Sequence, residues 1–512
     1  MTFDPCGVGG RQYGGPMADP TTATRPGTDL PDGYRPWPAL WAMVIGFFMI
    51  LVDSTIVSIA TPAIMRGLDA GVDSVLWVTS AYLLAYAVPL LITGRLGDRV
   101  GPKNLYLAGL AVFTLASLWC GLTNSITELV VARVVQGVGA SMMTPQTMAV
   151  ITRTFPAASR GQAMSLWGAT AGVATLVGPL LGGVLVDGPG WEWIFFINVP
   201  VGLIAFALAW RLVPTLQTHS HSFDLVGVAL SAVGMFLLVF GIQEGETYDW
   251  GTITGFITVK RLIVAGIVVM AVFVWWQSRI KREPLVPLGI FRDRNFSLSN
   301  LAITTVGFAI TAFAFPFTLF AQLVLGLSPT RAALLTVPTA VVSVIVAPFV
   351  GRLVDRMHPR VITTFGFVVG VLAFWWLSRS MTAGAPAWHL LGPMALVGLG
   401  TSTMFAPLAA TATRNLPLSS AGAGSGIYNT TRQVGAVLGS AAIAAVIEAR
   451  LRANLGDAAA GSGGMASAAG VKLPPQVADG FATAMSQAML LPAGVLVIGL
   501  VVVVFLAKPS HR

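Results

Sequence analysis

Apolar segments long enough to cross a lipid bilayer recur from residue 38 to residue 507 of this 512-residue chain. A helix needs about 20 predominantly apolar residues to span the hydrocarbon core, where every backbone polar group must find its partner within the protein. Charged residues make up only 10% of the chain, against roughly 25% in a soluble domain. The sequence therefore predicts an all-α integral membrane protein.

We predict fourteen membrane-spanning helices. They lie near residues 38–62, 75–96, 104–123, 127–150, 162–186, 192–213, 224–244, 258–278, 297–320, 331–353, 361–380, 386–411, 423–447 and 484–507. With the N-terminus in the cytoplasm, 20 of the 30 Lys and Arg residues lie inside, 8 lie outside, and Arg133 and Arg432 lie within the membrane. Because cytoplasmic loops carry an excess of basic residues, we expect both termini to be cytoplasmic. The net charge of +9 then reflects topology rather than a nucleic-acid partner.

Two short sequences occur twice at nearly the same offset. Residues 94–103 resemble residues 351–360, which lie 257 positions later, and residues 152–161 resemble residues 413–422, which lie 261 positions later. The common offset indicates that one half of the protein repeats the other, as in transporters built from two halves around a central path. The copies lie eight spans apart, so two extra spans separate two six-span repeats.

Polar segments at 214–223 and 279–295 mark the seventh and eighth spans as the extra pair. We therefore predict a disordered cytoplasmic tail, a first six-helix bundle, two linker helices and a second six-helix bundle at residues 1–37, 38–213, 214–295 and 296–508. Within the second bundle, the Ala- and Gly-rich residues 451–482 are expected to form a loop outside the membrane. The first 36 residues lack the apolar region of a signal peptide, so the first span is expected to direct insertion.

Several motifs resemble those of the major facilitator superfamily, in the same order along the chain. They occupy residues 51–62, 94–103, 133–140, 178–183, 191–200 and 429–435. With fourteen spans, the chain resembles the drug:proton antiporters of the EmrB/QacA type. The resemblance implies the major facilitator fold and a multidrug exporter that is driven by the proton gradient without a cofactor.

Asp53 is an acid placed deep in the first predicted span. It lies about 12 residues into that span, roughly 18 Å from the surface at 1.5 Å per residue. An unpaired ionised carboxyl at that depth costs several kcal/mol, so it is a functional-site hypothesis by default. Arg133, about six residues into the fourth span, enters from the opposite side to a similar depth, so the two side chains could meet. We expect a proton and a cationic substrate to compete for Asp53, with Arg133 taking part in coupling or organising the carboxylate; a fixed structural ion pair or a carboxyl that caps a broken helix is the alternative.

The duplicated loop supplies candidates for a cytoplasmic gate. Its acid can cap the positive end of a following helix, while its basic residues can pair with acids across the cytoplasmic gap or merely enforce topology. The candidates are Gly94, Asp98, Arg99, Gly101 and Lys103 in the first copy, with Gly351, Asp355 and Arg356 in the second. The second copy has His358 in place of the glycine at 101, so we expect it to be degraded and mechanically less important.

The fifth predicted span carries glycines at four-residue spacing. Such surfaces let helix backbones approach closely in lipid, and a proline adds a kink or hinge. The candidates for antiporter helix packing are Gly168, Gly172, Gly178, Pro179 and Gly182. The resemblance implies that this helix seals the outer side, and ordinary tight packing is the alternative. Ala174 departs from the family, which usually has its first glycine there.

Three further polar residues lie within predicted spans: Gln136 in the fourth, and Arg432 and Gln433 in the thirteenth. We expect Arg432 to be structural and to donate to carbonyl groups; contact with a substrate or an anion is the alternative. Glu448, near the outer end of the thirteenth span, is expected to be an interfacial charge rather than a binding carboxylate.

The sequence disfavours an enzyme and an ATP-driven pump. Five scattered histidines, Cys6 and Cys120 offer no metal site or catalytic cluster, and no phosphate-binding glycine-rich lysine motif is present. We predict a monomeric, proton-coupled exporter of lipophilic small molecules in the bacterial cytoplasmic membrane. Because no acid lies deep in spans 10 and 13, neutral or monocationic substrates are favoured over dications. The alternative is export of one endogenous lipid or metabolite, with drug efflux as a side activity.

Overall fold

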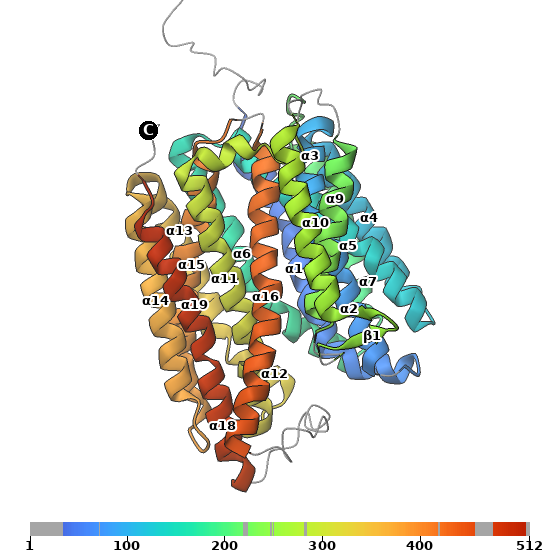
Figure 1. Ribbon diagram of the computed structural model, residues 1–512, viewed down its shortest axis with the longest axis vertical. Coiled ribbons are helices and arrows are strands. Elements are labelled where there is room, and N and C mark those ends of the chain that lie inside the picture. The colour runs from blue at the N-terminus through green and yellow to red at the C-terminus, as the bar shows by residue number, and fades with distance from the viewer. Residues whose placement is uncertain are drawn as a thin grey trace, which may run out of the picture.

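The structure is a computed structural model, and it describes residues 34–507 except for 71, 219–223, 246–247, 249, 281–283, 418–419 and 456–474. The described residues form two helical lobes that lie side by side (Figure 1). The prediction of an all-α membrane protein is confirmed. Most of the predicted tail, most of the predicted loop at 451–482, and the basic residues 281 and 282 lie outside the described residues.

The first lobe contains helices α1 to α8. Their bounds are α1 Pro36–Gly67, α2 Val72–Ala87, α3 Leu90–Val100, α4 Pro102–Leu122, α5 Ile126–Thr154, α6 Ala157–Asp187, α7 Trp193–Phe196 and α8 Asn198–Leu212. Proline begins α1 and α4, where its missing N–H costs no helical hydrogen bond. At Pro89 the second predicted span bends by 47° into α2 and α3. The sixth predicted span is likewise divided, into α7 and α8.

The second lobe contains the helices from α11 onward. Its elements are η1 Leu288–Arg292, α11 Arg294–Leu319, η2 Phe320–Val324, α12 Pro329–Leu334, α13 Val337–Arg356, α14 Pro359–Ser380, η3 Ala387–Leu390, α15 Leu391–Arg414, α16 Ala421–Leu455, α18 Pro475–Ala488 and α19 Leu490–Val504. Helix α16 extends to Leu455 and α18 begins at Pro475, so both ends of the loop predicted at 451–482 are helical. The α-helices α18 and α19 together form the last span.

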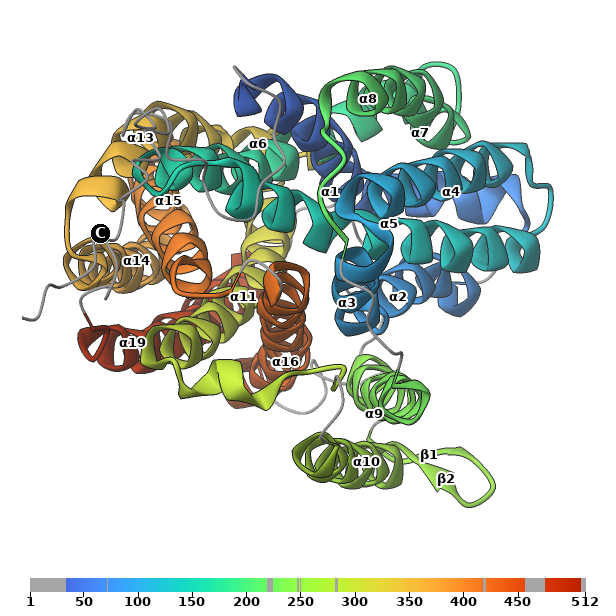
Figure 2. The ribbon, with the colours of Figure 1, turned by 90° about the horizontal axis from the view of Figure 1, so that it is seen from above.

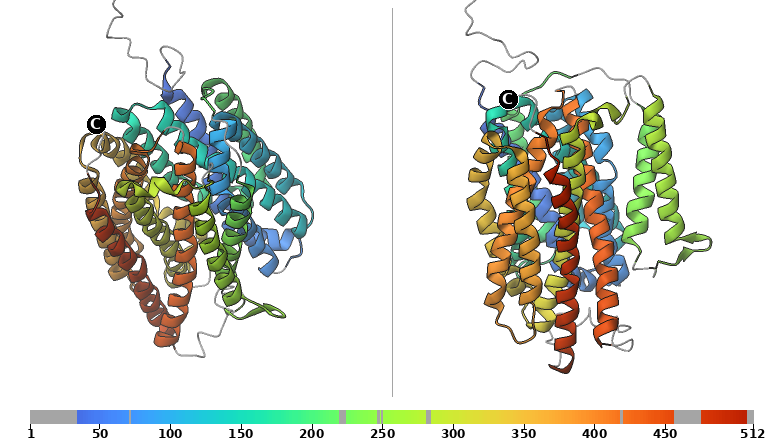
Figure 3. Two further views of the ribbon diagram at one scale, coloured as in Figure 1. Left: turned by 45° about the horizontal axis from the view of Figure 1, so that its top comes forward. Right: turned by 60° about the vertical axis from the view of Figure 1, so that its left-hand side comes forward.

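The two helices that lie between the lobes in sequence are α9 Leu225–Gln243 and α10 Val259–Arg279, and they pack against each other. Figure 2 shows them outside both lobes, and the right-hand view of Figure 3 shows the same pair standing apart. Helix α9 contacts α2 of the first lobe and α16 of the second. A short antiparallel ribbon, β1 Thr252–Thr254 and β2 Ile257–Thr258, joins α9 to α10. This ribbon was not predicted from the sequence.

The number of spans agrees with the prediction. In the described residues, 13 helices are long and apolar enough to cross a membrane, and counting the bent pair Trp77–Ala87 and Leu90–Val100 as one span gives 14. Two six-helix bundles with two additional helices are therefore present. Backbone hydrogen bonds within each helix satisfy the polar groups that lipid cannot.

The two lobes are in contact along much of α6, and one end of the bundle, which we call the terminal face because α1 begins and α19 ends there, carries two related contacts. Figure 1 shows this end at the top, beside the C-terminus. Besides the contacts of α6 with α12 and α15 and of α5 with α16, two helix pairs cross between the lobes at this face: α3 packs against α16, and α6 packs against α13. Each pair joins one helix of the first lobe to one of the second, so the contact repeats with the internal symmetry of the chain.

Candidate functional site

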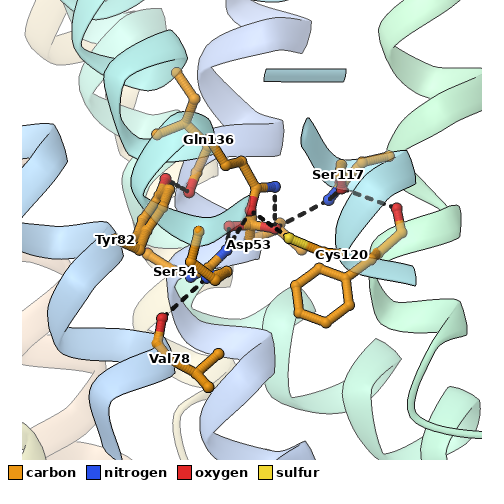
Figure 4. A network of polar contacts seen from close by, with 12 residues as sticks. Asp53, Ser54, Val78, Tyr82, Ser117, Cys120 and Gln136 are labelled. Atoms are coloured by element: carbon orange, nitrogen blue, oxygen red, sulfur yellow. Dashed lines mark hydrogen bonds and ion pairs between the residues drawn. The ribbon is translucent and has the colours of Figure 1, made fainter. Parts of the chain in front are cut away.

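Asp53 lies near the middle of the 32-residue helix α1, with its side chain fully buried. One carboxylate oxygen, Oδ2, accepts a hydrogen bond from Arg133 Nη1 at 2.5 Å. The other, Oδ1, accepts from Gln136 Nε2 and from Asn198 Nδ2, each at 3.0 Å. Three helices, α1, α5 and α8, thus converge on one carboxylate (Figure 4). The predicted meeting of Asp53 and Arg133 is confirmed.

Arg133 is held on several sides. Its Nε donates to the carbonyl oxygen of Val78 at 3.1 Å, and Nη1 also donates to Gln136 Oε1 at 2.6 Å. The guanidinium carbon lies 4.0 Å from the centre of the Tyr82 ring, a distance typical of a cation–π contact. Its last nitrogen, Nη2, has no hydrogen-bond partner within the described part of the chain. One buried donor is therefore available to a group that enters the site.

A second layer of polar groups positions Asn198. The Asn198 amide also donates to Ser117 Oγ at 3.0 Å, and Ser117 donates to the carbonyl oxygen of Phe195 at 3.0 Å. Sequence reasoning missed both Asn198 and Ser117 as site residues. A signal existed for Asn198, because it is the only amide in the sixth predicted span. Ser117 offered none, since serine is common in transmembrane helices.

Binding of a proton to Asp53 would change the net charge of the buried Asp53–Arg133 pair. Both side chains are 0% exposed, so neither charge is stabilised by water. Removing one partner of such a pair leaves the other charge uncompensated, at a cost of about 3–5 kcal/mol. Protonation of Asp53 would therefore drive Arg133 toward another acceptor or a displacement. The arrangement is chemically able to couple one proton to a movement of α1 against α5.

The acid of the first duplicated loop, Asp98, contacts the opposite lobe. Its Oδ1 accepts from the backbone N–H of Gly422 at 2.9 Å, and its Oδ2 accepts from that of Ala423 at 3.0 Å. These N–H groups are at the start of α16, where the helix dipole favours a negative charge. The prediction that Asp98 caps a helix is confirmed, but the expected helix is wrong: Asp98 caps α16 of the other lobe instead of the helix that follows it. Arg95 and Arg153 lie close enough to stabilise the carboxylate.

The second copy of the loop makes the matching contact. Asp355 Oδ1 accepts from the backbone N–H of Gly161 at 2.8 Å, near the start of α6. Gly161 and Gly422 are the last residues of the second pair of repeated sequences. The acid of each half therefore accepts a hydrogen bond from the other half, at the glycine that ends the second repeated sequence there. The second copy thus keeps the contact with the opposite lobe, and its lesser mechanical importance stays a prediction.

Glycines allow the helices to approach at both crossings. A Cβ on Gly94 would lie 2.7 Å from the Gly422 carbonyl oxygen, and one on Gly351 would lie 2.6 Å from Gln162 Cα. Such distances are shorter than real Cβ contacts, so only glycine fits without a shift of the backbone. Gly101 has a different role, because its φ of 98° lies in the left-handed region.

The basic loop residues lie at the edge of the terminal face. Arg99 is exposed in the last turn of α3, Lys103 is half-buried in the first turn of α4, and Arg356 is exposed at the end of α13. In the second copy His358 replaces the turn glycine, and its Nδ1 accepts from the backbone N–H of Arg360 at 3.2 Å. With a φ of −68°, His358 does not adopt the left-handed conformation of Gly101, and its side chain caps α14 instead.

The glycines of α6 face both lobes. A Cβ on Gly178 would lie 2.0 Å from Thr55 Oγ1 on α1, while Cβ atoms on Gly168 and Gly172 would lie 3.3 Å from Phe405 Cβ and 3.2 Å from Ser343 Oγ in the second lobe. Within the same helix are Pro179 and the buried residues Ala174 and Gly182. Helix α6 therefore packs closely beside Asp53 on one side and against the second lobe on the other.

We expect Gly178→Ala to destabilise the packing of α6 on α1. The added methyl group meets Thr55, and overpacking of this kind costs about 1–3 kcal/mol. Thermal unfolding of the purified protein measures the loss. Gly494→Ala on α19 is the matched control, because nothing lies within 4 Å of a Cβ there. Adding Thr55→Ala should restore part of the stability, and equal unfolding temperatures for both single variants would contradict the packing argument.

The polar residues of α16 differ from expectation in one case. Arg432 Nε and Nη2 are buried without a hydrogen-bond partner among the described residues, so the prediction of a structural arginine satisfied by carbonyls is wrong. Gln433 is half-buried beside it. Glu448 is exposed and forms an ion pair with Arg452, which agrees with the prediction of an interfacial charge.

A buried carboxylate–arginine pair lies inside one of two similar bundles that reciprocal contacts join, and such internal repeats are typical of membrane transporters. The sequence model of the Major Facilitator Superfamily matches residues 43–440. An uncharacterised MFS-type transporter of Mycobacterium tuberculosis is 53% identical over 489 residues, which cover 95% of this chain and 83% of that protein. The multidrug export protein EmrB of Escherichia coli is 30% identical over 405 residues, or 78% of each chain.

The fold agrees with these similarities. The solved structure of the proton:xylose symporter XylE superposes with a TM-score of 0.58 at 13% identity, covering 90% of this chain and 94% of that one. The chain belongs to the Major Facilitator Superfamily and, within it, to the drug-efflux transporters of the EmrB/QacA type. It is thus a multi-pass protein of the bacterial inner membrane.

Proposed function

We propose that the protein exports lipophilic, amphipathic compounds across the cytoplasmic membrane in exchange for protons. The observation that carries this proposal is the fully buried Asp53–Arg133 pair. An ionised pair and a protonated Asp53 are two states of different internal charge, and each favours a different arrangement of the surrounding helices. EmrB, to which the chain is similar, is a multidrug export protein, which supports a broad substrate range.

In this proposal the terminal face is cytoplasmic, as the distribution of basic residues predicts. The contacts of Asp98 and Asp355 with the opposite lobe close that face. They must break when the protein opens inward to take up substrate. Neutral and monocationic compounds remain the expected substrates of Asp53, since a single carboxylate can balance one positive charge.

Substrate-driven proton movement tests the proposal. The full-length protein is reconstituted into liposomes that contain a pH-sensitive dye, and the monocationic dye ethidium is added. We expect proton flux that rises with ethidium concentration and is absent from protein-free liposomes. Ethidium transport that continues at the same rate after a protonophore collapses the gradient would refute proton coupling. Transport of a single lipid from a host extract, with no transport of dyes, would favour the specific exporter instead.

A further inference from the structure

Arg432 lies deep in the second lobe without a partner. It follows the start of α16 at Ala421 by eleven residues, roughly 16 Å along the helix axis. Its Nε and Nη2 are buried and have no hydrogen-bond partner, and no ion pair involves it in the part of the chain that the structure describes. A guanidinium at this depth is costly unless it has a partner, so intramembrane arginines generally mark a substrate path or a binding group.

The backbone beneath Arg432 is fixed. A Cβ on Gly307 of α11 would lie 2.3 Å from the Arg432 carbonyl oxygen, and one on Gly435 would lie 2.0 Å from the Thr304 carbonyl oxygen. The two helices are therefore in direct backbone contact at Arg432 and about one turn after it. Because α16 cannot roll freely, the fold sets the direction in which the Arg432 side chain leaves the helix.

Two neighbours of Arg432 on α16 also carry unused polar groups. Tyr428, one turn earlier, is fully buried, and its hydroxyl has no hydrogen-bond partner among the residues that the structure describes. Asn429 is fully buried as well; its Nδ2 donates to the Ser425 carbonyl oxygen at 2.9 Å, but its Oδ1 has no partner. Asn429 Nδ2 also lies 4.0 Å from Met148 Sδ on α5. This part of α16 therefore faces the first lobe.

An aromatic surface of the first lobe belongs to the same buried cluster as Met148 and Tyr428. The rings of Phe47 and Trp167 stack with centroids 5.0 Å apart and planes inclined by 23°. Trp167 Nε1 is another buried donor without a partner. Among the described residues, the buried cluster shared by the two lobes thus combines aromatic rings with several polar groups that have no hydrogen-bond partner.

We propose that Arg432, assisted by the Tyr428 hydroxyl, binds an acidic group on an aromatic substrate. A guanidinium donates two parallel hydrogen bonds to a carboxylate or sulfonate, and stacked rings accommodate a planar apolar body. The proposal rests on the proposed export function and adds monoanionic aromatic compounds to the substrates expected from Asp53. The two charges lie in different lobes, so one transporter can receive compounds of either sign.

Two fluorescent probes that share one scaffold test this inference. Anilinonaphthalene sulfonate is a monoanion, and phenylnaphthylamine is the same ring system without the acidic group. Transport of each into proteoliposomes is driven by an imposed pH gradient and followed by fluorescence. We expect Arg432→Gln to raise the half-saturating concentration of the sulfonate by at least about tenfold, as loss of a charge-assisted contact predicts. Phenylnaphthylamine transport should change by less than about twofold.

Control variants separate recognition from folding. Arg452→Gln makes the same change at an exposed position of α16 and should leave both probes unaffected, while Arg432→Lys keeps the charge and should restore part of the sulfonate transport. Equal loss of both probes, or no effect on either, would overturn the proposal. If the wild type moves ethidium but neither naphthalene probe, this inference fails and the export function stands. If the gradient drives no compound at all, the proposed function itself fails.

Discussion

Asp53→Asn is expected to abolish substrate-driven proton flux, which should fall to the level of protein-free liposomes. The amide has the size of the carboxyl group and can still accept from Gln136 or Asn198, but it carries no charge and takes up no proton in the working pH range. Arg133 then stays uncompensated throughout the cycle, so its surroundings no longer alternate between two states. Proton release from proteoliposomes on addition of ethidium, compared with wild type, measures the effect.

The matched control is Glu448→Gln. It makes the same acid-to-amide change on an exposed carboxylate of α16 whose partner, Arg452, is also exposed. Exposed ion pairs contribute about 0–1 kcal/mol, so this variant should keep both its stability and its proton flux. Unchanged coupled transport in Asp53→Asn would show that the proton site lies elsewhere.

A second variant guards against misfolding. Removing the Asp53 charge leaves Arg133 buried without its counterion, which costs about 3–5 kcal/mol of stability. Combining Asp53→Asn with Arg133→Gln removes both charges and should recover much of the thermal stability. It should recover none of the proton flux. Coupling regained in the double variant would mean that the pair is structural and that protons act on another group.

The spans were predictable because lipid imposes one requirement on length and apolarity, and a sequence expresses it directly. The interruptions within spans were not predictable in this way. The bend at Pro89 and the break between α7 and α8 depend on which neighbours replace the lost helical hydrogen bonds. The break also places Asn198 at the first position of α8, where its amide reaches Asp53.

The candidate site, too, was predictable from the sequence only in part. Asp53 and Arg133 were predicted to meet because charge at depth has few tolerable explanations. The capping of α16 by Asp98 joins residues more than 300 positions apart, and only the tertiary arrangement of the lobes brings them together. Arg432 was misjudged because a sequence shows where a donor lies but not whether any acceptor is within reach.

The repeated sequences gain a physical meaning from this arrangement. Internal similarity first indicated a duplicated bundle, but the two repeated sequences are also the two sides of one contact. One supplies an acid near the end of a helix, and the other supplies a glycine near the start of a helix, whose N–H donates to that acid. Because each half supplies both parts, pairing the halves forms two equivalent contacts. Closure of the terminal face is therefore shared between Asp98 and Asp355, although proton coupling is proposed for the first half alone.

Asp98→Ala and Asp355→Ala are each expected to shift the protein toward a state that is open at the terminal face. A hydrogen bond to a charged group contributes about 1.5–3 kcal/mol. Loss of about 2 kcal/mol would favour the open state roughly 30-fold, since 1.4 kcal/mol corresponds to a factor of about ten. Asp98 receives two backbone N–H groups and Asp355 Oδ1 one, so Asp98→Ala should have the larger effect. The sites share no residue, and the double variant should show nearly the sum.

Distances between spin labels across the terminal face measure this shift. Cysteines at Asn104 in the first lobe and Arg360 in the second, both exposed, carry the labels in a background with Cys6→Ser and Cys120→Ser. Wild type should give mainly the short distance, and each alanine variant should add a longer one. Asp479→Ala, on α18 at the opposite end of the bundle, is the matched control and should leave the distribution unchanged. If Asp355→Ala also leaves it unchanged while Asp98→Ala opens the face, the two contacts are not mechanically equivalent, and the gate belongs to the first copy alone.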